Sequence, residues 1–347
     1  RNLVIKTSIG DIVELKPYAY QLIDGVEKEV KCKFQIKGNS VSFSFPKGYN
    51  QNLELVIDPQ LIFSTFTGAT SDNWGFTATY DNAGNTYAGG IVFGTGYPKT
   101  TGAYQTTFGG GTIDIGITKF NTQGNGLIYS TLLGGNSADS PHSLVVNQST
   151  DELYVLGTTS SNNFPTTVGC FDNTFNGGVN ITTTGTTVNY PNGSDIFVTK
   201  FSAAGNTLIG STYIGGSGND GLNISPQTEY NYGDSYRGEI IVDNAGDCYI
   251  SSCTFSNNFP TALPFQAANG GNLDGCVFKL SSNLTTLVFS SYIGGSGNDA
   301  AYSVERDNAG NVFIAGGTAS NNFPTTPGAH KTTLTGGTDG FVSKIHL

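Results

Sequence analysis

Four aspartates recur at one position after a repeated glycine-containing motif. The motif reads STFTGA at 64–69, STLLGG at 130–135, STYIGG at 211–216 and SSYIGG at 290–295, and the acids that follow are Asp72, Asp139, Asp220 and Asp299. Paired carboxylates cleave glycosidic bonds, so a ring of such residues has the groups a glycosidase needs. Four equivalent acids more often accept hydrogen bonds from loop amides, and we favour that interpretation.

Other signs of catalysis are weak. The three histidines, His142, His330 and His346, lie in no HExxH motif and beside no GxSxG nucleophile motif. The stretch GGSGND at 215–220 and 294–299 resembles a phosphate-binding loop but lacks its lysine. The turn DNAGN at 81–85 and 307–311 lacks the alternating acids of a calcium loop. We therefore predict no catalytic residue, no cofactor and no metal, and hence no enzyme.

A second recurring pair combines an acid and a lysine five residues apart. The pairs are Asp114/Lys119, Asp195/Lys200, Asp274/Lys279 and Asp339/Lys344. Each pair opens and closes a strand-like run. Neighbouring repeats should bury these lysines in part, so they need acidic or carbonyl partners. We interpret them as a structural pair in each repeat.

These residues belong to a repeated unit of four short strands. Two strand-like runs flank a turn such as DNAGN, a Phe-Pro stretch such as SNNFPTT follows, and a third run comes next. The next STYIGG-like motif is the fourth strand. Four strands repeated radially are typical of a β-propeller blade. In the Phe-Pro stretches, Phe164, Phe259 and Phe323 should plug the space between blades as structural residues.

The repeats define the domain organisation. We predict an all-β chain with a small β-sandwich-like domain at 1–58 and a propeller at 59–347. The four repeats cover approximately 68–133, 134–214, 215–293 and 294–347. The last repeat lacks a fourth strand, so we expect residues 61–67 to supply it and close a four-bladed ring without exposed edges. The 1–58 core is thin and should rely on the propeller or on upstream sequence.

Composition excludes some functions. The formal charge is −10, which argues against nucleic acid as a partner. No run of 18 apolar residues is present, so we expect no membrane span in this chain. Cys253 ends a second strand and Cys276 begins the neighbouring third strand. These two cysteines either form a disulfide or are buried as small apolar residues.

The motifs STYIGGSGND, DNAGNVFIAGGTASNNFPTT and GGTDGFVSKI resemble the SBBP family of bacterial β-propeller repeats. The preceding segment, with GDIVELKPYAYQ, resembles the end of the β-rich domain that commonly precedes such repeats. The resemblance covers about residues 61–347. It implies a secreted or cell-surface bacterial protein and brings no catalytic residues.

Blade topology predicts where a ligand would bind. The insertions at 176–194 and 222–236 should emerge on one face, in adjacent blades, and meet. The candidate ligand-binding residues there are Trp74, Tyr190, Tyr230, Tyr232, Tyr236, Asp220 and Asp234. Tyrosine and tryptophan suit glycan or protein ligands, although the tyrosines could equally serve to hold the loops. We expect a non-catalytic extracellular or cell-surface module for binding or adhesion. The alternatives are a purely structural surface or assembly protein that packs on other domains or copies, and a carbohydrate-active enzyme.

Overall fold

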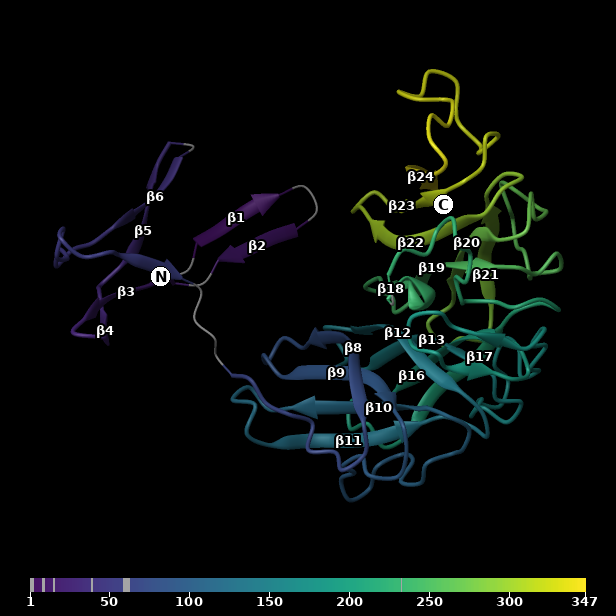
Figure 1. Ribbon diagram of the computed structural model, residues 1–347, viewed down its shortest axis with the longest axis horizontal. Coiled ribbons are helices and arrows are strands. Elements are labelled where there is room, and N and C mark those ends of the chain that lie inside the picture. Colours follow the sequence, from purple (N-terminus) through teal and green to yellow (C-terminus); the bar gives the residue numbers. More distant parts are fainter. Residues whose placement is uncertain (1–2, 8–9, 15, 39, 59–62, 232) are drawn as a thin grey trace. The chain divides into compact units, whose positions relative to one another are not determined.

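The computed structural model describes the chain except residues 1–2, 8–9, 15, 39, 59–62 and 232 (Figure 1). The described residues form two compact units. One ends at Ser64, and the other covers Thr65–Arg306 and Gly310–Leu347. No helix among the described residues has the length and apolar character needed to cross a membrane.

The N-terminal unit consists of small antiparallel sheets. Strands β1 (Leu3–Thr7) and β2 (Gly10–Glu14) form a hairpin, as do β5 (Lys33–Lys37) and β6 (Ser40–Ser44). Strand β3 (Tyr18–Ile23) lies between β4 (Val26–Glu29) and β7 (Val56–Asp58). The buried core is Ala19, Val30 and Cys32, with Phe45 and Leu55 packed against it. A core of this size provides little apolar burial.

The second unit contains four antiparallel sheets in chain order. The first is β8 (Asn73–Tyr80), β9 (Thr86–Val92), β10 (Asp114–Phe120) and β11 (Leu127–Leu133). The second is β12 (Asp139–Val146), β13 (Leu153–Thr159), β16 (Asp195–Phe201) and β17 (Leu208–Ile214). The third is β18 (Glu239–Val242), β19 (Cys248–Thr254), β20 (Asp274–Leu280) and β21 (Leu287–Ile293). The fourth is β22 (Asp299–Arg306), β23 (Asn311–Thr318) and β24 (Asp339–His346).

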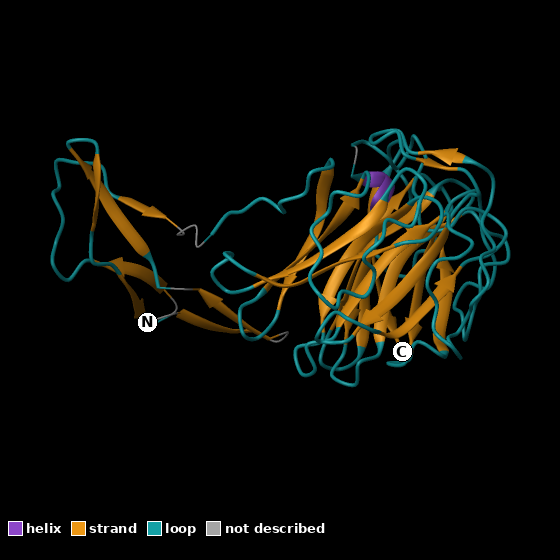
Figure 2. Ribbon diagram, turned by 90° about the horizontal axis from the view of Figure 1, so that it is seen from below, coloured by secondary structure: helices purple, strands orange, loops and turns teal. Residues whose placement is uncertain are grey.

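The sheets follow one another in an arc from β8–β11 to β22–β24 (Figure 1). Figure 2 shows their strands running alongside one another, with loops at both strand ends. The long connections add the short hairpin of β14 (Ile181–Thr182) and β15 (Asn189–Tyr190), and the 3₁₀ helix η1 (Asp234–Tyr236). This all-β arrangement of antiparallel sheets is consistent with the predicted β-propeller.

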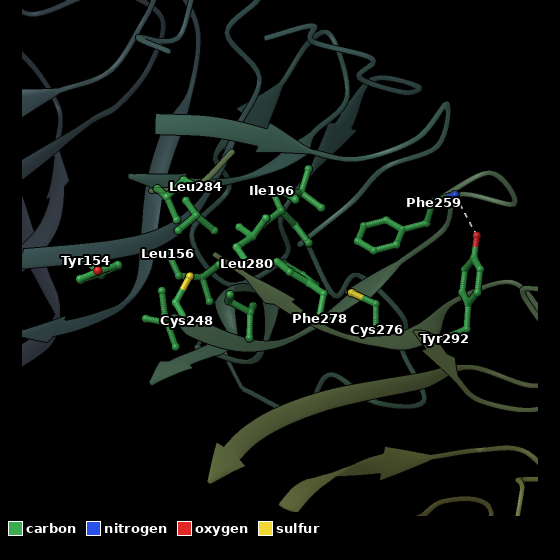
Figure 3. Packing of buried hydrophobic residues seen from close by; sticks show 14 residues of the cluster. Tyr154, Leu156, Ile196, Cys248, Phe259, Cys276, Phe278, Leu280, Leu284 and Tyr292 are labelled. Atoms are coloured by element: carbon green, nitrogen blue, oxygen red, sulfur yellow. Dashed lines mark hydrogen bonds between the residues drawn. The ribbon is translucent and has the colours of Figure 1, made fainter. Parts of the chain in front are cut away.

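Apolar side chains of neighbouring sheets interlock between them. Leu156 and Ile196 of the second sheet pack with Ile250 and Phe278 of the third in one buried cluster (Figure 3). Similar clusters join the first sheet to the second and the third to the fourth. Because both faces of an inner sheet are covered, strands such as β13 and β16 are buried at every residue and do not alternate.

The DNAGN stretches are turns, as predicted. Asp81 Oδ1 accepts hydrogen bonds from the backbone N–H groups of Ala83 and Asn85, at 3.1 and 2.9 Å. Gly84 follows with φ +84°, a conformation that glycine adopts at no steric cost. The carboxylate of Asp81 therefore stabilises the turn by accepting hydrogen bonds from its backbone.

The predicted closing strand is not formed. Residues 61 and 62 lie outside the described residues, and 63–67 lie in no strand. Among the described residues, β24 has β23 as its only hydrogen-bonded neighbour. The prediction that 61–67 pairs with the last sheet is therefore wrong for this structure. Similarity to the other fourth strands indicates that this segment fits the outer edge of such a sheet. Whether it reaches the edge of the last sheet depends on how far the arc of sheets curves back.

Of the two alternatives for Cys253 and Cys276, the disulfide is not formed and the burial is observed, since both thiols are free and buried. Cys253 is paired with Gly275, and Cys276 with Ser252. The two cysteines are therefore offset by one residue, and successive side chains in a strand point to opposite faces. Cys253 packs with Leu273, whereas Cys276 belongs to the core between the second and third sheets.

Candidate binding site at the innermost strands

Three of the innermost strands contain a bulge at the same position. The register shifts by one residue in β8, β12 and β22, leaving an extra residue in each strand. The extra residues are Phe76, His142 and Tyr302. A β-bulge redirects a side chain out of the regular alternation and is common beside binding sites. The chain thus places three large rings at equivalent positions on the inner side of the arc.

A glycine in the neighbouring strand makes each bulge possible. Gly90, Gly157 and Gly316 lie where a Cβ would be 2.0, 2.2 and 2.1 Å from a backbone carbonyl oxygen of the inner strand. No larger residue fits there unless the bulged backbone moves. Glycine at these positions therefore leaves the room that the bulged backbone needs.

The third sheet fills the corresponding position differently. Its inner strand begins only at Glu239, so Gly238 stands where the other sheets have a ring. The preceding Arg237 supplies the side chain instead. Its Nε donates to Asp234 Oδ1 at 2.7 Å, and its guanidinium lies over the Tyr302 ring at 5.3 Å. Arg237 is half exposed, so the guanidinium keeps donors for a ligand.

These residues surround a cavity of about 330 Å³. It is lined by Gly75, Phe76, Pro141, His142, Gly233, Tyr236, Arg237, Gly238 and Tyr302. A second cavity of about 410 Å³ shares Arg237 and Tyr302 and adds Tyr230. Aromatic walls around a guanidinium are the elements of a site for a polar ligand with a flat apolar face.

His142 contributes a neutral, unpaired nitrogen to the first cavity. Burial lowers the pKa of His142 to about 3, so its imidazole is uncharged at neutral pH. Nε2 lies 3.0 Å from the Thr158 hydroxyl, whereas Nδ1 is buried without a hydrogen-bond partner. A buried polar atom without a partner is costly and rare. Nδ1 can therefore bind a ligand group, but an imidazole with this pKa is a poor general base at neutral pH.

The two long insertions meet, as predicted. The Tyr236 hydroxyl lies within hydrogen-bonding distance of the Thr183 and Thr186 hydroxyls, at 3.0 and 2.5 Å. Thr184 Oγ1 also donates to Glu229 Oε1 at 2.5 Å. Each insertion therefore holds the other in place beside the innermost strands.

Four of the predicted ligand-binding residues serve this loop scaffold instead. Tyr190 and Tyr236 are 0 and 5 % exposed, and the Tyr190 hydroxyl donates to Ser140 Oγ at 2.9 Å. Asp220 Oδ2 accepts from Gly216 N at 2.7 Å, and Asp234 Oδ2 accepts from Tyr230 N at 2.8 Å. Tyr190 and Asp220 line neither of the two cavities, whereas Asp234 lines the second and Tyr236 the first, and loop and core groups already bind polar atoms of all four. Tyr236 reaches the cavity only as part of its wall.

The other three predicted residues differ in placement. Tyr230 is 76 % exposed at the second cavity, and its hydroxyl lies 3.4 Å from Thr338 Oγ1. Trp74 is 46 % exposed and makes an edge contact with Phe93, at 5.4 Å between ring centroids. Tyr232 lies outside the described residues. Among the described members of the predicted set, Tyr230 is thus the exposed tyrosine that lines a cavity.

The recurring lysines are bound to acids of the turns, not to the aspartates of their own strands. Lys119 Nζ lies 2.8 Å from Asp81 Oδ2, Lys200 Nζ lies 2.7 Å from Glu152 Oε2, and Lys279 Nζ lies 2.8 Å from Asp247 Oδ2. Five residues of strand span about 17 Å, so the aspartate and the lysine at the two ends of a third strand are too far apart to contact each other. Lys344 lies over the Phe313 ring at 5.2 Å. The expectation that these lysines need acidic partners is therefore confirmed for Lys119, Lys200 and Lys279.

Three of the four aspartates that open the third strands, Asp114, Asp195 and Asp274, are buried at the junctions between sheets, and Asp339 is partly buried. Burial raises the pKa of Asp114 and of Asp195 to about 8, and that of Asp274 to about 6. Each also faces an acid of the next sheet, respectively Asp139, Asp220 and Asp299, which raises its pKa further. Among the described residues, no group of three or more His, Cys, Asp or Glu is placed to hold a metal.

The phenylalanines of the Phe-Pro stretches lie against the third strands. Phe164 and Phe259 are both 3 % exposed, and Phe323 is less deeply buried. The Phe164 ring lies 4.3 Å from that of Phe197, and the Phe323 ring lies 4.5 Å from that of Phe341. These positions are in the packing between strands and sheets, and none lines the first cavity.

Residue pattern alone did not single out Phe76, His142, Arg237 and Tyr302 as a group. A signal was present for three of them. Asn73, Asp139 and Asp299 occupy one register position at the start of the inner strands, and the ring follows each by three residues. The position varies among Phe, His and Tyr, so a search for identical residues overlooks it.

Comparison with known proteins agrees with the repeats. The SBBP β-propeller repeat matches residues 128–165 and 288–324, and each match runs from a fourth strand to the next Phe-Pro stretch. A domain of unknown function, DUF7948, matches residues 1–60. No curated protein matches the chain. A crystal structure of a protein of unknown function from Dyadobacter fermentans DSM 18053 is similar at 10 % identity and a TM-score of 0.37, covering 93 % of this chain and 79 % of that one. The two family matches confirm the resemblance to SBBP-type repeat proteins with a DUF7948 domain at the N-terminus.

Proposed function

We propose that the chain is a non-catalytic binding module whose ligand is a glycan with an acidic group. The observation that carries this proposal is the convergence of Arg237 with the rings of Phe76 and Tyr302 at the bulged inner strands. Sugar rings present a C–H face that packs on aromatic side chains. A guanidinium offers a planar fork that matches a carboxylate.

The neutral state of His142 favours binding over catalysis. At neutral pH its Nδ1 can exchange a hydrogen bond with a sugar hydroxyl without adding charge. The recurring aspartates support the same interpretation. Asp139 and Asp220 are 0 % exposed, and backbone amides and hydroxyls already donate to both. Placement outside the cell or on its surface is part of the proposal, and it rests on the resemblance to secreted repeat proteins.

A glycan array tests the proposal with matched neutral, uronic-acid and sialic-acid sugars. We expect the whole chain to bind acidic sugars in preference to neutral ones. Arg237→Lys keeps a cation beside Asp234 but loses the fork, so binding should fall about tenfold or more. Arg306→Gln is the matched control, since Arg306 lies over the Tyr249 ring, away from the cavity.

Two results would count against the proposal. One is equal binding of neutral and acidic sugars. The other is unchanged binding by Arg237→Lys at an unchanged melting temperature. Fractionation of the source cells, with the protein found only in the cytoplasm, would contradict the proposed location.

A further inference from the structure

The fourth sheet lacks the outer strand that its three predecessors have. In those sheets β11, β17 and β21 cover the outer edges of β10, β16 and β20. At equivalent register positions, Tyr213 pairs with Phe197 and Tyr292 with Cys276. The corresponding residue of β24 is Phe341, and no strand among the described residues pairs with that edge. An unpaired edge presents a row of free N–H and C=O groups that can pair with another strand.

A groove of about 510 Å³ lies where the missing strand would run. Phe323, Pro324, Phe341 and Val342 are among the residues that line it. Val342 is 79 % exposed, whereas its counterparts Val198 and Val277 are 0 and 1 % exposed. The last sheet is thus open both at its edge and on the face that a next sheet would cover.

The complete sheets show what the groove is built to hold. The first serine of each fourth strand donates its hydroxyl to the carbonyl of a proline that follows an aromatic residue, Tyr97 in the first repeat and Phe in the others. The distances are 2.7 Å for Ser130 to Pro98, 2.6 Å for Ser211 to Pro165 and 2.6 Å for Ser290 to Pro260. In the second and third sheets the tyrosine two residues later packs near the phenylalanine of this stretch, Tyr213 with Phe164 at 6.1 Å and Tyr292 with Phe259 at 6.2 Å. In the first sheet Leu132 packs with Tyr97. The fourth sheet offers the same two features in Pro324 and Phe323.

One segment of the chain has the sequence of a fourth strand but does not occupy that place. Ser64, Thr65 and Phe66 in STFTGA correspond to Ser211, Thr212 and Tyr213 in STYIGG. Phe66 is 95 % exposed. Its ring is therefore not buried against other parts of the single chain, although its counterpart Tyr213 is 1 % exposed.

The segment is fixed to the sheet at the other end of the arc. Thr70 N donates to the Gly96 carbonyl at 3.0 Å, and Ala69 packs with Tyr97 of the first sheet. The first and last sheets lie at the two ends of the arc (Figure 1). A second molecule, however, can bring its first sheet and this segment up to the open edge.

We propose that residues 63–67 of one copy complete the fourth sheet of a second copy, with Phe66 packed on Phe323 and Phe341. Ser64 then donates to the Pro324 carbonyl, as its counterparts do. A reciprocal exchange about a twofold axis joins two arcs into a closed ring of eight sheets. It pairs both free β24 edges and covers Val342 with the first sheet of the partner copy.

Mass measurement after size exclusion tests the exchange on the whole chain. We expect a dimer of twice the 36.4 kDa of one chain. Phe66→Asp should weaken the dimer by about 100-fold, as for a central anchor of an interface. It should leave the fold intact, because Phe66 contacts solvent in the single chain. Val168→Asp is the matched control, since Val168 is fully exposed and lies outside the proposed contact. A monomer at all concentrations, or a dimer that Phe66→Asp leaves unchanged, would overturn the proposal.

Cross-linking identifies which chain supplies the strand. Thr212 pairs with Val198 and Ser291 with Val277, so Thr65 should pair with Val342. We would mix a Thr65→Cys chain with a differently tagged Val342→Cys chain, both carrying Cys170→Ser, and oxidise the mixture. We expect a disulfide-linked product that carries both tags, and none when Val168→Cys replaces Val342→Cys. A double variant that links Thr65→Cys to Val342→Cys within one chain, with no product from the mixture, would assign the strand to its own molecule and refute the exchange.

Discussion

Two adjacent glycines of β23 provide a sharp test of how the bulges are held. Both lie in extended backbone and face different surroundings. A Cβ on Gly316 would lie 2.1 Å from the carbonyl oxygen of Ala300 and 2.7 Å from ring carbons of Phe341. A Cβ on Gly317 would meet nothing closer than 3.5 Å, and the nearest atoms belong to the Tyr302 side chain. Real Cβ contacts essentially never fall below 3.0 Å.

The two alanine substitutions should therefore change the free energy of unfolding by different amounts, and the changes could have opposite signs. In Gly316→Ala the backbone of β22 must move by about 1 Å at the bulge, and strain of this kind in a packed region costs about 3 kcal/mol. A loss of about 3 kcal/mol lowers the melting temperature of a domain this large by roughly 6–12 °C. Gly317→Ala removes freedom from the unfolded chain at no steric cost, so its stability should change by less than about 1 kcal/mol.

Differential scanning calorimetry of the two variants and the parent chain measures this difference. Gly157→Ala gives an independent check, because its Cβ would lie 2.2 Å from the carbonyl of Ser140. Equal melting temperatures for Gly316→Ala and Gly317→Ala would refute the argument that the glycine makes the bulge possible. The Gly316 variant should also lose glycan binding, since the bulge orients Tyr302.

Three further predictions concern charge and thiols. Burial raises the pKa of Asp139 and Asp220 to about 7, so their stabilising contribution is complete below about pH 4 and disappears as the pH rises through 7. The melting temperature should fall between pH 5 and pH 8.5, and a flat or rising profile would show that these acids are ionised in the fold. Lys119→Met leaves the carboxylate of Asp81 buried without its lysine, and it should lower the free energy of unfolding in urea by about 3 kcal/mol. The double variant Lys119→Met/Asp81→Asn should recover part of this loss. Equal losses in the single and the double variant would contradict this prediction. Cys170, the one partly exposed thiol among the five cysteines, should react first with N-ethylmaleimide in peptide mapping, and faster labelling of a buried cysteine would argue for a different packing.

The turn motifs and strand-like runs of the sequence were sufficient to predict the repeat unit. The four-strand order, the DNAGN turns and the third strands with their terminal acids and lysines all follow from short-range rules about turns and strand runs. The meeting of the two insertions also followed, because strand direction alternates and places both loops on one face. Each of these features depends on residues close in sequence or on topology alone.

Other features depended on the pairing register of the strands and on the curvature of the arc of sheets. Neither can be deduced from short stretches of the sequence. An offset of one residue in pairing separates Cys253 from Cys276, and one extra residue in an inner strand brings His142 to the cavity. Tyr190 and Tyr236 became core residues because two loops pack on each other, and that burial is visible only after folding. The sequence determined that 61–67 resembles a fourth strand. Only the tertiary structure decided that the described part, 63–67, remains outside its own last sheet, because the packing angle between successive sheets sets where the two ends of the arc lie.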